Sequence, residues 1–133
     1  MPRVPVPPEV DAFLAGPNPA VVATVSPSGT PHTAATWYDW KDGRVLLNMD
    51  EGRLRLRYMR ENPAVALTVL GEESWYAQVT LLGRVVSIED DPDLADIDRL
   101  SIRYGGGPFH SRDARRVSAW MEPARWTGWP LPR

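Results

Sequence analysis

The pattern of apolar and polar residues along this chain predicts a protein built mainly from short strands. Runs rich in β-branched and other apolar residues recur at short intervals, and turn residues such as proline, glycine and aspartate separate them. The predicted strands cover residues 20–26, 32–40, 44–49, 64–70 and 75–89, with one or two more over 117–129. Short turns join the first three strands, which favours an antiparallel meander. Six or so mostly antiparallel strands with few helices indicate a mainly β fold, a small β-barrel with flanking helices.

Two other segments are predicted to be helices. Residues 7–16 have a proline in the first turn, acidic residues near the start and a glycine at the end. Residues 90–104 follow similar rules, with Asp91 as the cap and Pro92 in the first turn. Their apolar side chains fall on one helical face, namely Leu94, Ile97 and Leu100. In the long strand before this helix, Gly83 is expected to form a bulge or a corner.

An arginine-rich segment, EGRLRLRYMRENP at residues 51–63, fits either a strand or a helix. As a strand it presents Arg53, Arg55 and Arg57 on one face. As a helix it places Arg53, Arg57 and Arg60 on a single stripe. Acidic residues precede the segment, and its closing Glu-Asn-Pro resists helical angles, so both flanks carry helix boundary signals. Leucine, arginine and methionine are also good helix formers, and the sequence therefore predicts a short helix.

The start of this helix is a candidate anion site. It places Arg53 and Arg55 in the first turn, directly after a strand that ends in Asn48 and Met49. First-turn amides point outward unpaired, and the helix dipole there is positive, so a bound phosphate would be favourable. The alternative is an ordinary solvated helix face, in which the arginines pair with neighbouring glutamates. The residues alone leave both interpretations open.

Composition and charge exclude several classes of site. The chain has 133 residues, which suits one domain over 1–133 with a short proline-rich leader at 1–8. It has no cysteine, and its two histidines, His32 and His110, are far apart, so neither a disulfide nor a metal site is expected. A net charge of −2 argues against nucleic acid as a partner. No segment has the apolar length of a signal peptide or a membrane span, so we expect a cytoplasmic protein without a membrane partner.

Four stretches together resemble one known family. They are AVVATVSPSGTPHTAATWYDW at 20–40, GRVLLNMDEGRLRLRYMRENPAVAL at 43–67, LLGRVV at 81–86 and ARRVSAWMEPARWTGW at 114–129. Their order and spacing are similar to those of the pyridoxamine 5′-phosphate oxidase-like family of flavin and deazaflavin enzymes, and the match covers about residues 9–129. The resemblance implies the split β-barrel fold known from FMN-binding proteins. It also implies a homodimer with two cofactor sites between the subunits.

The resemblance assigns site residues by position. Arg53 and Arg55 would hold the cofactor phosphate, aided by Asn48 and by the backbone near Met49. The strand positions that would lie along the ring system are Ala35, Thr36 and Trp37. The residue that would approach from the partner subunit is Gln78, or one of the aromatic residues such as Trp75, Tyr76 and Trp126. No catalytic residue is assigned.

The branch that this sequence looks closest to is the one that binds the deazaflavin F-420. The expected activity is that of an oxidoreductase that transfers hydride to a small electron-poor substrate, with the cofactor doing the chemical step. Two alternatives stay open: an FMN-dependent oxidoreductase of the same fold, and a non-enzymatic protein that binds a cofactor or a haem-like ligand. No Ser-His-Asp order, P-loop or paired-carboxylate motif suggests a different reaction.

Overall fold

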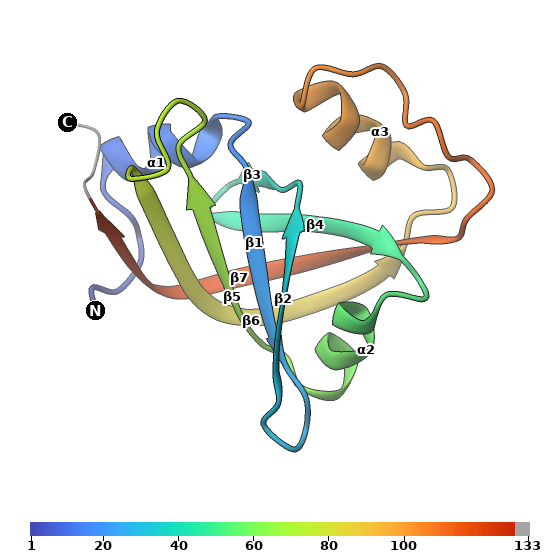
Figure 1. Ribbon diagram of the computed structural model, residues 1–133, viewed down its shortest axis with the longest axis horizontal. Coiled ribbons are helices and arrows are strands. Elements are labelled where there is room, and N and C mark those ends of the chain that lie inside the picture. Colours follow the sequence, from blue (N-terminus) through green and yellow to red (C-terminus); the bar gives the residue numbers. More distant parts are fainter. Residues whose placement is uncertain (130–133) are drawn as a thin grey trace.

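The computed structural model describes residues 1–129, in which seven strands form one antiparallel sheet that curls into a half-barrel (Figure 1). The strands are β1 (Ala20–Val25), β2 (Pro31–Thr36), β3 (Asp39–Lys41), β4 (Arg44–Asp50), β5 (Ala64–Leu70), β6 (Gln78–Asp90) and β7 (Arg116–Trp129). Their order in the sheet is β2-β1-β5-β6-β7-β4-β3. The predicted mainly β fold is confirmed.

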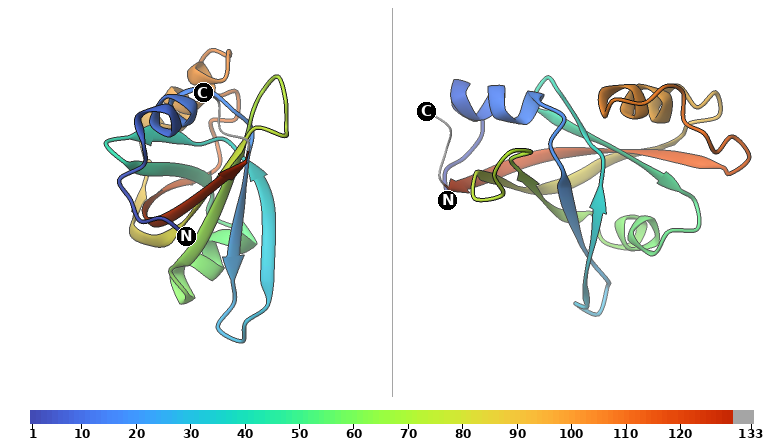
Figure 2. Two further views of the ribbon diagram at one scale, coloured as in Figure 1. Left: turned by 90° about the vertical axis from the view of Figure 1, so that its left-hand side faces the viewer. Right: turned by 45° about the horizontal axis from the view of Figure 1, so that its top comes forward.

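Helices flank the sheet on two sides: α1 (Pro8–Ala15), α2 (Leu54–Glu61) and α3 (Ala95–Arg103). In both figures α1 and α3 lie on one side of the half-barrel and α2 on the other (Figure 2). Helix α2 packs against β1 and β2, and α1 packs against β3. The arginine-rich segment is thus a helix, as predicted. Among the described residues, none of the helices has the length and apolar character needed to cross a membrane.

The main core lies inside the curled sheet, where alternate residues of the strands meet. Val22, Leu67, Leu81 and Met121 are among its buried members. Strand β4 differs because both of its faces are buried: one face joins the core, while Asn48 on the other contacts the segment that leads into α3. A second small cluster lies along α3 and consists of Leu94, Ile97 and Leu100, with Phe109 packed against it.

The prediction of one strand over 32–40 is wrong, because Trp37 and Tyr38 are not in strand conformation and interrupt it. Strands β2 and β3 on either side of the break lie at opposite edges of the sheet, so the predicted meander is wrong as well. Only the β1–β2 and β3–β4 hairpins form. The break buries Tyr38 completely, and its hydroxyl donates to the carbonyl oxygens of Leu14 at 2.7 Å and Gly16 at 3.0 Å. These tertiary contacts override the local strand pattern.

Other predicted boundaries also shift. Strand β6 begins at Gln78, not at residue 75, and the last segment is one continuous strand. Helix α3 begins at Ala95, so the predicted start near residue 90 is wrong and Pro92 lies outside the helix. Asp91 nevertheless caps the helix from a distance, because its carboxylate accepts hydrogen bonds from the amides of Asp96 at 3.2 Å and Ile97 at 3.0 Å.

The predicted irregularity at Gly83 is confirmed. The register between β6 and β7 shifts between Leu82 and Gly83, where Gly83 faces Pro123. Strand β6 curves strongly along its length (Figure 1). A bulge at this position increases the local bend and twist, which helps the long strands to wrap around the core.

Candidate functional site

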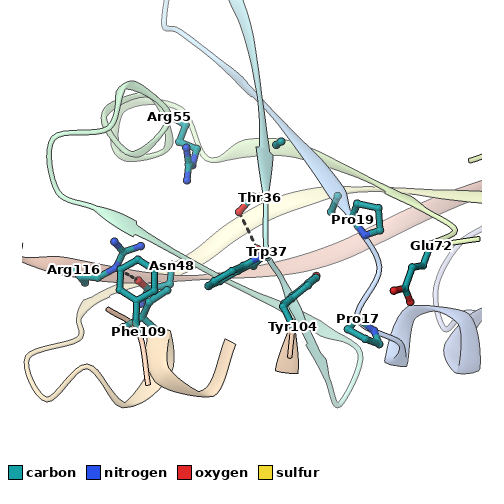
Figure 3. A pocket seen from close by; sticks show the side chains of 13 residues that line it. Pro17, Pro19, Thr36, Trp37, Asn48, Arg55, Glu72, Tyr104, Phe109 and Arg116 are labelled. Atoms are coloured by element: carbon teal, nitrogen blue, oxygen red, sulfur yellow. Dashed lines mark hydrogen bonds between the residues drawn. The ribbon is translucent and has the colours of Figure 1, made fainter. Parts of the chain in front are cut away.

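A cavity of about 580 Å³ opens where β2, β4, α2 and α3 approach one another. This volume is in the range of small-molecule sites in proteins. Segments far apart in the sequence line it (Figure 3). The lining residues are Pro17, Pro19, Ala20, Ala35, Thr36, Trp37, Asn48, Arg55, Glu72, Ile97, Tyr104, Phe109 and Arg116.

Aromatic side chains form one wall of the cavity. Trp37, directly after β2, stacks on Tyr104 with ring centroids 5.4 Å apart and an angle of 12° between the planes. Phe109 meets Trp37 edge-on at 6.1 Å. Trp37 is still 37% exposed, so it keeps apolar surface for a ligand. A flat wall of this kind suits a planar ring system.

Arg103 at the end of α3 holds this wall in place. Its guanidinium donates to the carbonyl oxygens of Ala15 at 2.8 Å, Gly16 at 2.7 Å and Tyr38 at 2.9 Å. The next residue, Tyr104, donates its hydroxyl to the carbonyl oxygen of Asn18 at 2.7 Å. Burial raises the pKa of the Tyr38 and Tyr104 phenols, so both stay protonated and keep donating hydrogen bonds at neutral pH. The wall is therefore tied to the end of α1 and to the β2–β3 connection.

The end of the cavity near α2 is positively charged instead of aromatic, because three guanidinium groups lie close together there. Arg55 and Arg116 line the cavity, and Arg53 lies beside them at the start of α2. Burial lowers the pKa of Arg55, and the charges of Arg53 and Arg116 lower it further against an opposing effect of Asp50. Burial also lowers the pKa of Arg116. Burial thus disfavours the charged forms of Arg55 and Arg116 relative to an exposed arginine, and an anion bound beside them would offset this effect.

The carboxylate of Asp50 forms ion pairs with two of these arginines. Asp50 lies 2.9 Å from the Nη1 atom of Arg116 and 3.5 Å from the Nη2 atom of Arg53. Among the ion pairs of residues 1–129, none involves Arg55. The alternative of an ordinary solvated face therefore describes Arg57, which pairs with Glu61 at 3.6 Å, but not Arg55.

A buried polar network holds Arg116 in position. Its Nε atom donates to Oδ1 of Asn48 at 2.8 Å, and the amide nitrogen of Asn48 donates to Asp91 at 3.1 Å and Ser118 at 3.0 Å. Ser118 in turn donates to Asp96 at 2.6 Å. Because both amide protons of Asn48 are used within the protein, its main contribution is to orient Arg116.

Replacing Asp91 by alanine is expected to lower the free energy of unfolding by about 2–3 kcal/mol. The change leaves one buried amide proton of Asn48 and two α3 amides without an acceptor. Urea unfolding followed by circular dichroism measures the effect. Asp93→Ala is the matched control, since Asp93 is exposed two residues away. Equal stability of the two variants would contradict the role of the network.

The structure brings together most of the residues that the sequence proposed for the site. Those that line the cavity are Ala35, Thr36, Trp37, Asn48 and Arg55. Arg53 lies next to it, paired with Asp50. The Met49 side chain instead points into the main core, so only its backbone remains available to the site. Gln78, at the start of β6, does not line the cavity.

Sequence reasoning missed several lining residues. Arg116 is the most important, because it reaches the site only through the pairing of β4 with β7, where it stands opposite Asp50. Tyr104 and Phe109 were also missed, since they lie at the end of α3 and in the loop after it. The one local signal was the basic cluster at residues 112–116, which resembled an ordinary charged turn.

Several proteins of known structure resemble this chain in fold. An F-420 reductase of known structure superposes with a TM-score of 0.84 at 30% identity, covering 92% of this chain and 98% of that one. A conserved hypothetical protein from Mycobacterium tuberculosis gives 0.71 at 22% identity, with 98% and 91% covered. The heme storage protein HutZ from Vibrio cholerae gives 0.67 at 15% identity, with 96% and 97% covered. The last two support the fold alone.

No curated protein matches the sequence. The family model for pyridoxamine 5′-phosphate oxidase, in contrast, matches residues 6–130. Together with the superpositions, this confirms the split-barrel fold that the resemblance implied. The chain belongs to the pyridoxamine 5′-phosphate oxidase family.

Proposed function

We propose that this protein is an oxidoreductase that binds the deazaflavin F-420 in the cavity and reduces a small electron-poor substrate. The observation that carries the proposal is Arg55, a half-buried guanidinium that faces the cavity without a carboxylate partner among the described residues. A phosphate would supply the missing negative charge. Membership of a family that binds flavin-type cofactors and 30% identity to an F-420 reductase support this choice.

The residues present fit such a cofactor. Arg55 and Arg116 would hold the phosphate through charge-assisted hydrogen bonds, with Arg53 adding positive charge nearby. The planar ring system would lie along Ala35, Thr36 and the exposed surface of Trp37. The aromatic wall behind Trp37 is fixed by Tyr104 and Arg103, so the ring would meet a prearranged surface. Prearrangement reduces the entropy lost on binding.

The protein residues contribute binding, orientation and exclusion of water. A deazaflavin supplies hydride chemistry when bound. The apolar lining around Trp37, Phe109 and Ile97 keeps water away from one side of the ring site, which protects a reactive hydride donor. Nothing in the lining is assigned as a proton donor.

A homodimer is part of this proposal. Trp75 and Tyr76 are 70% and 66% exposed in the connection between β5 and β6, which is unusual for two large adjacent aromatic residues. We propose that a second copy covers them and that Gln78 approaches the cofactor of the other subunit. Trp126 is 8% exposed and packs in the main core of its own subunit, so it is not assigned this role.

FMN is the second candidate, because it carries a phosphate that the same arginines would accept. A haem-like ligand has less support. The part of the cavity lining that the structure describes contains no histidine, cysteine or methionine, which are common axial ligands of haem iron.

Titration of the purified protein with F-420 and with FMN tests the proposal. We expect F-420 to bind with a Kd below about 1 μM and at least roughly tenfold more tightly than FMN, measured by the fluorescence of each cofactor. Tighter binding of FMN would replace the cofactor assignment but keep the arginine site. If neither compound binds better than micromolar, the proposed function is wrong.

A further inference from the structure

The end of the cavity away from the arginines carries a negative charge. Figure 3 shows Arg55 and Arg116 on one side of Trp37, and Glu72 on the other side, beside Pro17. Glu72 is exposed and takes part in none of the ion pairs found within residues 1–129. The cavity is therefore electrically polar along its length.

Hydrogen bonds fix the loop that carries Glu72. The backbone amide of Gly71 donates to the carbonyl oxygen of Ala77 at 2.7 Å, which closes the base of the loop. The nearly buried side chain of Asn18 accepts from the amide of Glu72 at 3.2 Å and donates to the carbonyl oxygen of Phe13 at 2.8 Å. Asn18 thus ties the backbone of Glu72 to the end of α1, which positions this residue at the mouth of the cavity.

Two aromatic residues follow Glu72 in the same loop. Trp75 and Tyr76 have ring centroids 5.6 Å apart, and both are mainly exposed. An unpaired carboxylate at the mouth of a cavity attracts positive charge. Anionic compounds would be repelled from the same end.

We propose that Glu72 makes this end of the cavity select substrates that carry a positive charge beside their reducible group. The inference rests on the proposed function, in which the anionic end of the cofactor takes the arginine end and leaves the Glu72 end to the substrate. The selection also suits hydride transfer, because a positive charge withdraws electrons from an acceptor ring and makes it easier to reduce. Glu72 is here a specificity residue and not a catalytic one.

A pair of matched quinones tests the inference by direct binding. The first probe is a naphthoquinone with a trimethylammonium group on a short side chain, and the second is its uncharged tert-butyl isostere. Quinones quench tryptophan fluorescence, and Trp37 and Trp75 lie at the cavity and on the loop. We expect the parent protein to bind the cationic probe roughly fivefold to tenfold more tightly than the neutral one at low salt. The preference should shrink at high salt because of screening.

Three variants separate charge from structure. Glu72→Gln should remove the preference, whereas Glu72→Asp should retain part of it because the charge remains. Glu73→Gln is the matched control, since Glu73 is an exposed neighbour that does not line the cavity. Glu73→Gln should bind both quinones and F-420 as the parent does.

The outcomes for Glu72 and for the cofactor are independent. If the parent shows no preference for the cationic probe, or if Glu72→Gln keeps it, the inference is overturned, whatever the affinity for F-420. If Glu72→Gln abolishes the preference while no form of the protein binds F-420, the charge selection stands and the proposed cofactor is wrong.

Discussion

Replacing Arg55 by alanine is expected to weaken F-420 binding roughly a hundredfold, because the proposed charge-assisted hydrogen bonding to the phosphate would be lost. Adding Arg53→Ala should weaken binding further, since the second charge also acts on the site. Fluorescence titration of the cofactor measures both effects. Arg57→Ala is the matched control, as Arg57 lies on the same helix and pairs with Glu61 at 3.6 Å.

Stability gives a second test of the same assignment. The guanidinium of Arg55 is half-buried beside two other guanidinium groups, and its lowered pKa means that the folded protein disfavours its charge. Without cofactor, Arg55→Ala should therefore be at least as stable as the parent in thermal unfolding. A ligand-binding residue behaves in this way, whereas a structural residue does not. A variant that loses stability but keeps its affinity for F-420 would contradict the assignment.

Replacing Gly83 by alanine should lower the free energy of unfolding by about 3 kcal/mol or more. A Cβ atom there would overlap the carbonyl oxygen of Glu122 and lie 2.7 Å from the Cα atom of Pro123, both of which belong to the backbone of β7. Neither can move without separating the two longest strands. Chemical denaturation measures the loss.

Gly107→Ala is the control for Gly83. A Cβ atom at Gly107 meets nothing within 4 Å, and its backbone has no positive φ angle, so this variant should stay within about 0.5 kcal/mol of the parent. If Gly83→Ala unfolds at the same denaturant concentration as Gly107→Ala, the close contact between β6 and β7 is not essential.

Local patterns were sufficient for most of the elements. The helix over the arginine-rich segment, the bulge at Gly83 and most strands are confirmed because each depends on neighbouring residues: side-chain periodicity, boundary signals and turn residues. The two-residue period of strands also explains why only the backbone of Met49 is available to the site. Asn48 and Met49 are consecutive on β4 and their side chains face opposite sides of the sheet.

The break at Trp37 and Tyr38 shows where local patterns fail. The segment over 32–40 has the residues of one strand, but burying Tyr38 against Leu14 and Gly16 satisfies a hydroxyl and fills the core at the same time. Leu14 belongs to α1 and Gly16 follows it directly, so neither partner can be found in the strand itself. The same break presents Trp37 to the cavity, so the aromatic wall depends on it.

The sequence alone determined most of the strands and helices, the family resemblance and one half of the candidate anion site, because Arg53 and Arg55 are placed by the helix and its N-cap. Only the tertiary structure decided that Asp50 would be shared between Arg53 and Arg116 and that Arg55 would face the cavity unpaired. The tertiary structure also decided that Glu72 would line the end of the cavity away from the arginines (Figure 3). The physical reason is that charge balance in a site depends on which distant groups the strand register brings together, here Arg116 opposite Asp50.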